Sequence, residues 1–247
     1  MEIHHHADVP KKEKHLKHYL FEFLMLFLAV TGGFFVENQR EHYIENKREK
    51  QFIHSLMEDL KLDTAVLGKD IQYRYATENR FDTLIPLLKS QNPNANSGHI
   101  YYLARLGSRK NHWSYNDRTI QQLRNSGNFR IIRNTKVSDS ILQYDLMMRQ
   151  VLYLNDHEYN TIIGDYRKQV MTIFNPLVFQ EMQREDSFEP PAGNPPLFST
   201  NPELLNLLAA HAHYVRNHTG LVRKKEMAQK NYAISLILFL KKEYHLE

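Results

Sequence analysis

The chain has 247 residues, of which 42% are hydrophobic and 11% aromatic. This composition is typical of a folded chain with one or two domains, and it excludes an intrinsically disordered protein. The formal charge of +4 is the small difference between 32 basic and 28 acidic residues, so we expect no nucleic-acid partner. Cysteine is absent from the sequence, which excludes disulfides, thiolate metal ligands and cysteine nucleophiles and leaves the redox compartment open.

The first predicted element is a transmembrane helix at residues 19–37, which follows a basic and His-rich tail at residues 1–18. From Leu20 to Val36 the only charge is Glu22, and as a helix this run rises about 25 Å. A hydrocarbon core is about 30 Å thick, so the run suffices for a short span. A cleaved export signal and the core helix of a soluble protein are the alternatives. We favour the span, because no A-x-A-like cleavage site closes the run and no helical face is clearly polar.

Three residues of this run are candidates for contact between membrane helices. Glu22 stands near the start of the run, where a carboxylate can reach headgroup water; the alternative is that it pairs with a partner helix. Ala29 and Gly33 are four residues apart, a spacing of small residues that lets two membrane helices approach closely. The expected partners are therefore the lipid bilayer and, within it, other envelope membrane proteins or a second copy of this chain.

The orientation of the span does not follow from charge. Four lysines precede the run, and Arg40, Lys47, Arg48 and Lys50 follow it. The positive-inside rule counts these bases on both sides, and it favours neither orientation.

Two segments carry a resemblance to a family. Residues 19–63 combine a glutamate-led apolar helix, an exit that contains Asn and Glu, a basic-acidic helix, and a Leu-x-x-Asp-Leu motif at Leu56, Asp59 and Leu60. This stretch resembles the opening of uncharacterised single-pass membrane proteins that are common in Bacteroidota.

The second segment of the resemblance lies at residues 123–134. It consists of Leu-Arg-Asn-Ser-Gly, then Phe-Arg-Ile-Ile, then Asn134 ahead of a long helix, and it is similar to a series in the same family. The match covers residues 1–150 in pattern, and Gln39 stands where the family often has tryptophan. The resemblance implies an inner-membrane protein with a cytoplasmic N-terminus and a periplasmic C-terminal domain. It implies no activity.

Beyond the span, residues 38–247 are predicted to form a helical extramembrane domain. The first long helix carries a seam of positions in alternating steps of four and three, mostly apolar and interrupted in the middle: Ile53, Met57, Leu60, Thr64, Leu67, Ile71, Arg74, Glu78, Phe81, Ile85 and Leu88. This seam predicts packing against the later helices of the chain, with a self-associating parallel coil as the alternative. Pro86 is expected to kink or end the helix.

The middle of the chain is predicted to be less regular. Residues 90–98 have the composition of a loop, and a short helix is expected between a cap at Asp117 and an end at Gly127. The aromatic side chains around this short helix are expected to seat it on the long helices, with an aromatic ligand pocket as the alternative. These side chains are Trp113, Tyr115 and Phe129.

Two further long helices complete the predicted fold. The first covers residues 136–174 and closes at Asn175 and Pro176, and a proline-rich extended connector follows at residues 186–202. The last helix has Asn201 as its cap, and its seam includes Leu204, Leu208, His211, Val215, His218, Val222, Lys225, Tyr232, Leu236 and Phe239. The predicted fold class is all-α, a single N-terminal transmembrane helix followed by a long-helix antiparallel bundle.

The sequence carries no recognisable catalytic motif. A nucleophile elbow, a phosphate loop, a dinucleotide fingerprint and a His-Glu-x-x-His helix are all absent, so we predict no catalytic residue, no cofactor and no metal site. The tail at His4, His5, His6 and Asp8 could bind a transition metal ion but is taken as incidental. His211 and His218 fall on one face of the last helix, where they are candidates for pH sensing or, more commonly, for hydrogen bonding inside the bundle.

Three functions remain open from the sequence. The first is a membrane-anchored helical scaffold or accessory subunit of a cell-envelope complex without catalytic activity. The second is a periplasmic ligand-sensing bundle that signals through a partner protein, because the N-terminal tail is too short for an output domain. The third is an enzyme of unrecognised type.

Overall fold

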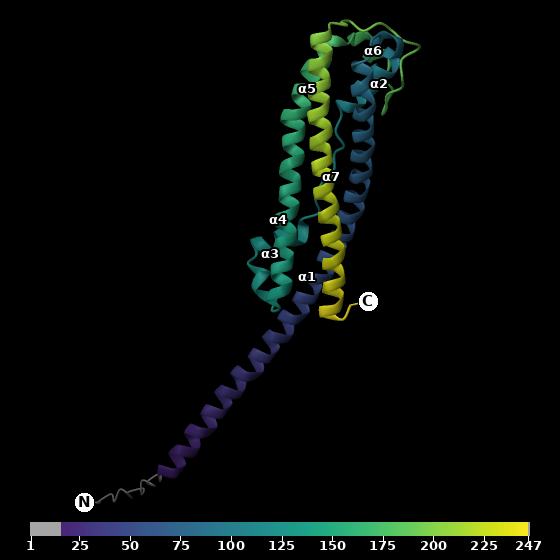
Figure 1. Ribbon diagram of the computed structural model, residues 1–247. Helices are drawn as coiled ribbons and strands as arrows, with labels where there is room; N and C mark the ends of the chain where they lie inside the picture. Colours follow the sequence, from purple (N-terminus) through teal and green to yellow (C-terminus); the bar gives the residue numbers. More distant parts are fainter. Residues whose placement is uncertain (1–15, 247) are drawn as a thin grey trace, which may run out of the picture. The chain divides into compact units, whose positions relative to one another are not determined.

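The computed structural model describes residues 16–246, and the predicted all-α fold class is confirmed (Figure 1). The α-helices are α1 (Leu16–Leu88), α2 (Ser97–Gly107), α3 (Arg118–Asn125), α4 (Thr135–His157), α5 (Ile163–Ile173), α6 (Pro176–Glu181) and α7 (Pro202–Tyr244). Two 3₁₀ helices, η1 (Pro93–Asn96) and η2 (Asn128–Ile131), and one π-helical turn, η3 (Glu158–Ile162), lie between them. In the part of the chain that the structure describes, β structure is limited to an isolated bridge between Gln183 and Phe188.

The chain divides into two units, and helix α1 contributes to both. The first unit ends at Gln51 and the second begins at Phe52. The described part of the first unit is a single helical segment, and its apolar run is unburied: every large apolar side chain from Leu20 to Val36 is at least 46% exposed. This helix is apolar and long enough to be a membrane anchor or a signal sequence.

The second unit is a bundle of three long helical stretches: α1 from Phe52 onward, α4 through α5, and α7 (Figure 1). Tyr144 on α4 pairs with Asp63 on α1, and farther along both helices Asn155 pairs with Arg74, so α1 and α4 run in the same direction. Helix α7 runs opposite to both. The bundle is therefore only partly antiparallel, because the segment that contains α2 and α3 returns the chain to the Asp63 level before α4 begins.

The segment predicted as a loop at residues 90–98 is more regular than expected. It contains η1, and Ser97 and Gly98 already belong to α2. Helix α2 starts without a side-chain cap, so the sequence lacks the usual start signal. Its stability comes from packing, since Ile100, Tyr101 and Ala104 are fully buried.

Local signals at other helix ends are confirmed. The Asn201 side chain accepts a hydrogen bond from the backbone N–H of Glu203 (2.8 Å), and Gly127 adopts a left-handed φ of 66° just after α3. Pro86 lies in the final turn of α1, which ends two residues later at Leu88. Asn175 not only follows α5 but also caps α6, with its side chain accepting from Leu177 N–H at 3.0 Å.

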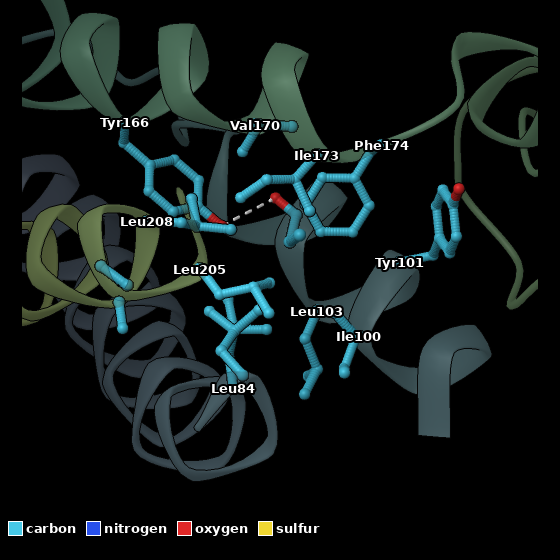
Figure 2. Packing of buried hydrophobic residues seen from close by; sticks show 14 of the residues in the cluster. Leu84, Ile100, Tyr101, Leu103, Tyr166, Val170, Ile173, Phe174, Leu205 and Leu208 are labelled. Atoms are coloured by element: carbon cyan, nitrogen blue, oxygen red, sulfur yellow. Dashed lines mark hydrogen bonds between the residues drawn. The ribbon is translucent and has the colours of Figure 1, made fainter. Parts of the chain in front are cut away.

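The second unit has two apolar cores, one toward each end of its α1 segment. The core around α2, α5 and the start of α7 contains Leu84, Tyr101, Phe174 and Leu208 (Figure 2). The dashed hydrogen bond in Figure 2 runs from the Tyr166 hydroxyl to the carbonyl oxygen of Ala104 (3.3 Å).

The other core lies around α3, α4 and the end of α7. Its buried residues include Leu56, Leu60, Leu123, Ile141 and Leu236. Trp113, Tyr115 and Phe129 pack against this core, as predicted. The α1 residues of the two cores are separated by a polar stretch of the same helix, which holds the candidate site.

Candidate functional site

A buried ionic cluster, centred on Arg74, joins the three long helical stretches between the two apolar cores. The guanidinium of Arg74 donates from Nε to Asp70 on α1 (2.8 Å) and to Glu226 on α7 (3.0 Å). It also donates from Nη1 to Glu158 in η3 (2.7 Å) and from Nη2 to Asn155 on α4 (2.8 Å). These four partners and Arg74 define the ionic cluster.

The ionic cluster contains more negative than positive charge. The side chains of Arg74, Asp70, Glu158 and Glu226 are each at most 4% exposed, so water does not compensate the difference. Burial lowers the pKa of Arg74, but the attraction of Glu158, Glu226 and Asp70 outweighs it and leaves the pKa raised. Arg74 is therefore a permanent cation facing three carboxyl groups.

One carboxyl group of the cluster holds a proton at neutral pH. Burial raises the pKa of Glu226 to about 9, Arg74 opposes this shift, and Asp70 adds to it. Glu226 Oε2 is buried and has no hydrogen-bond partner. If Glu226 and Asp70 were both ionised, neither could donate a hydrogen bond to the other. A proton on Glu226 supplies the donor for a hydrogen bond to Asp70, so the neutral form satisfies both groups.

The π-helical turn η3 positions Glu158 in the cluster. Glu158 Oε2 accepts from Arg74, and its Oε1 accepts from the Thr219 hydroxyl on α7 (2.6 Å). A π-helical turn widens the helix locally and is frequent at functional sites. A cavity of about 10 Å³ adjoins Arg74, Glu158 and Thr219, which is room for about one water molecule. The interior of the cluster is thus too small for an organic ligand.

A second ion pair lies one turn along α1 from Arg74. Arg223 on α7 donates from Nη2 to Glu78 Oε2 (3.2 Å) and from Nε to Glu78 Oε1. Gly220 leaves room for this approach, because a Cβ at that position would lie 3.1 Å from Glu78 Oε2 and the carboxylate would have to shift slightly. Glu78 and Arg74 are the charged interruptions of the α1 seam, and side chains of other helices pair with both.

Two more buried carboxylates tie the irregular segment to α1. Asp63 accepts from the Tyr144 hydroxyl (2.7 Å) and from Asn116 N–H (2.9 Å); burial nevertheless raises the pKa of Asp63. Asp59 accepts from the backbone N–H (3.1 Å) and hydroxyl (2.7 Å) of Thr119. The predicted cap, Asp117, makes no capping hydrogen bond, so a residue of another helix caps α3 in its place.

The predicted membrane-contact residues lie on the unburied apolar segment of the first unit. Glu22 is 3.1 Å from His18, and both side chains are about half exposed. Ala29 and Gly33 are exposed, and no atom lies within 4 Å of a Cβ built at Gly33. This face of the helix is therefore uncovered by the described chain.

The predicted pH-sensing residues, His211 and His218, are both partly buried on α7. His218 donates from Nε2 to the carbonyl oxygen of Leu154 (3.1 Å), and its ring centroid is 5.9 Å from that of His157. His211 is partly buried one heptad earlier on α7. The tail at residues 4–8 lies outside the described residues.

The α7 seam differs from the prediction in its second half. Lys225 is exposed, and the neighbouring Glu226 and Gln229 are fully buried in its place. Heptad spacing favoured the wrong position here, because the buried side chains on this part of the helix are polar and no apolar residue marked the buried face.

Sequence reasoning missed the carboxyl groups of the ionic cluster. A signal for one of them was present, since a second heptad series on α1 is buried throughout: Leu56, Asp63, Asp70, Thr77 and Leu84. Charged residues inside such a series indicate buried ion pairs or hydrogen bonds. Glu158 and Glu226 had no comparable signal.

The cluster has the properties of a structural junction. Across residues 16–246, no group of three His, Asp or Glu side chains is arranged to hold a metal ion, and Arg74 occupies the centre where a cation would sit. Comparisons with protein-family models, with curated proteins and with solved structures find no match for this chain.

Proposed function

We propose that this chain is a non-enzymatic, membrane-anchored helical scaffold or accessory subunit of a cell-envelope complex. One observation carries the proposal: an 18-residue window of α1 has a mean hydropathy of 1.9, and 0% of it is buried. Burying one large apolar side chain gains roughly 1.5–3 kcal/mol, so this many exposed side chains favour a lipid environment strongly. The second unit then supplies a rigid helical surface for partner proteins.

The proposed location is the inner membrane, with the N-terminus in the cytoplasm and the helical unit in the periplasm. The resemblance of residues 19–63 to single-pass membrane proteins supports this orientation. Protease added to intact spheroplasts should digest the second unit. Full protection of that unit would reverse the proposed orientation.

A matched pair of variants tests the anchor. Leu28→Arg places a charge in the middle of the run, which costs roughly 2.5–3.5 kcal/mol on insertion scales, whereas Gln39→Arg lies beyond its end. We expect wild type and Gln39→Arg to stay in the membrane pellet after alkaline carbonate extraction, and Leu28→Arg to be partly released. An intact mass that begins after Val36 would instead identify the run as a cleaved signal.

The scaffold role itself is tested by its partners. Affinity purification from native membranes in mild detergent, followed by mass spectrometry, should return partner proteins in stoichiometric amounts. A lone monomer in such a preparation would count against the scaffold.

A ligand-sensing bundle that signals through a partner protein is the second candidate. The cavity at the ionic cluster has room for only about one water molecule, so a ligand would have to bind nearer the surface. The specific observation that favours this candidate is a group of three arginines, Arg105, Arg109 and Arg167, that form no ion pair with a carboxylate of residues 16–246.

A further inference from the structure

Three arginines of the second unit gather around two aromatic rings. The Cζ atoms of Arg105 on α2 and Arg109 just after it lie 4.6 and 5.0 Å from the ring centroid of Phe188. The Cζ of Arg167 on α5 lies 4.8 Å from the ring centroid of Tyr159. We call Arg105, Arg109 and Arg167 the arginine cluster.

The charges of the arginine cluster are close enough to affect one another. Burial lowers the pKa of Arg105, and the neighbouring charges of Arg109 and Arg167 lower it further. A hydrogen bond from Arg167, with added positive charge from Lys110 and Arg109, lowers the pKa of Tyr159. The three guanidinium groups therefore share one local field of positive sign.

None of the three arginines forms an ion pair with a carboxylate of residues 16–246. Two acids of the same segments are engaged elsewhere: Glu189 pairs with Arg184 (2.6 Å) and Asp156 lies 3.7 Å from Lys110. Several other arginines of the second unit do pair with carboxylates, among them Arg74, Arg118, Arg124, Arg149, Arg216 and Arg223. The arginine cluster thus brings together three guanidinium groups without the carboxylate partners that these other arginines have.

One buried hydrogen-bond donor of the cluster is also unused. Arg105 Nε is buried and has no hydrogen-bond partner, and Phe188 offers none because its ring has no oxygen or nitrogen. Arg167 is held in place by Ser108, whose carbonyl oxygen accepts from Nε (2.8 Å) and from Nη2 (2.6 Å). The Tyr73 hydroxyl donates to the Arg109 carbonyl oxygen (3.2 Å) and fixes the adjoining backbone.

We propose that the arginine cluster is a binding site for a multiply charged oxyanion of the phosphate type. Guanidinium groups present paired N–H donors that match phosphate oxygens, and hydrogen bonds between ions are about twice as strong as neutral ones. Two of the three arginines, Arg105 and Arg167, are half-buried, and three adjacent positive charges attract a multiply charged anion more strongly than a singly charged one. A phosphate group carries about 1.5 to 2 negative charges at neutral pH, whereas a monocarboxylate carries one.

This site is independent of the scaffold role. A scaffold without a ligand would gain nothing from three adjacent, uncompensated cations, whose mutual repulsion destabilises the folded unit. The bound anion removes that repulsion, so binding should stabilise the second unit against unfolding.

The test uses the full chain in a non-ionic detergent, with pyrophosphate as the probe. The melting temperature should rise with pyrophosphate concentration, and it should rise less with sodium acetate or sodium chloride at equal ionic strength. The absence of any rise specific to pyrophosphate would overturn the proposal.

Matched variants locate the site. Arg105→Gln and Arg109→Gln should each weaken pyrophosphate binding by about tenfold or more, as expected for the loss of a hydrogen bond between charged groups. Arg130→Gln, an exposed arginine of the same unit on η2, should leave binding unchanged. An equal loss of affinity in Arg130→Gln would show non-specific charge attraction and would overturn the site.

The stability of the variants without ligand separates binding from folding. At low salt, Arg105→Gln should melt at the same temperature as wild type or higher, because it relieves repulsion. Arg105→Lys keeps the charge and loses the paired donors, so it should bind pyrophosphate more weakly than wild type does. Wild-type affinity in folded Arg105→Gln would contradict the proposal.

A last comparison distinguishes a free phosphate compound from a lipid headgroup. Pyrophosphate affinity is measured in nanodiscs of phosphatidylcholine alone and in nanodiscs that also contain phosphatidylglycerol. Equal affinity in both supports a soluble ligand. Phosphatidylglycerol that competes for the site would weaken pyrophosphate binding in wild type, and Arg105→Gln would then bind equally in both kinds of nanodisc. This result would assign the site to a lipid phosphate and would overturn a soluble ligand.

Discussion

The ionic cluster and the arginine cluster are two charged regions of the same helical unit with opposite balances. In the ionic cluster, one guanidinium meets three carboxyl groups and an amide, and all of them are buried. In the arginine cluster, three guanidinium groups meet aromatic rings and backbone oxygen, and no carboxylate of residues 16–246 pairs with them.

The difference shows how a fold tolerates charge. Inside the bundle, charges are compensated by their own chain, because an unpaired buried ion costs several kcal/mol. Nearer the surface, water lowers that cost, and an excess charge can be kept for a ligand. The first arrangement fixes the helices relative to one another, and the second offers a site.

Removing Arg74 should lower the free energy of unfolding more than any other change proposed for these two clusters. Arg74→Met keeps a long apolar stem but leaves three buried carboxyl groups without a cation, and we expect a loss of about 3–5 kcal/mol in the free energy of unfolding. Urea denaturation of the full chain in detergent measures it. The control is Arg216→Met, which breaks the more exposed ion pair with Asp82 and should cost at most about 1 kcal/mol. Equal losses in the two variants would contradict the central role of Arg74.

Neutralising Glu226 should change the pH dependence of stability. In wild type the folded chain keeps a proton on Glu226 up to about pH 9, whereas the unfolded chain releases it near the ordinary pKa of 4.5. The contribution of this group to stability is complete below pH 4.5 and is lost progressively as the pH rises toward 9.

Glu226→Gln imitates the protonated form, so its stability should not fall in this way. The difference in the free energy of unfolding between the variant and wild type should widen by at most roughly 1.4 kcal/mol per pH unit. Urea midpoints at several pH values between 5 and 8.5 give the difference curve, and Glu181→Gln, exposed on α6, serves as the control. A constant gap would show that Glu226 is ionised in the folded chain.

Removing Asp59, the α1 residue that caps α3, should lower the free energy of unfolding by a smaller amount. Asp59→Ala leaves the N–H and hydroxyl of Thr119 without their acceptor, and the expected loss is about 1–2 kcal/mol. Asp139→Ala, an exposed position on α4, should be nearly neutral. Hydrogen exchange should locate the loosening in α3, and unchanged protection there would argue against capping by Asp59.

Local signals predicted several elements correctly. Asn201 starts α7, Gly127 follows the end of α3, and the apolar run forms a helix, because each depends on residues that are neighbours in sequence. Helix α2 was missed, since burial of its apolar face stabilises it and no cap marks its start.

The sequence by itself determined the helical class, the heptad spacing of α1 and of the first half of α7, and the single apolar run near the N-terminus. It showed Arg74 and Glu78 only as interruptions of an apolar seam. The tertiary structure decided what these interruptions do, because their partners lie far along the chain: Glu158 is 84 residues from Arg74, and Glu226 is 152 residues away.

The same holds for the arginine cluster. Arg105, Arg109 and Arg167 lie with Phe188 and Tyr159 on segments that are distant in sequence, and only packing brings them together. The physical reason is that hydrophobic periodicity specifies which face of a helix is buried, whereas pairing of charges depends on which helices meet and in which direction they run.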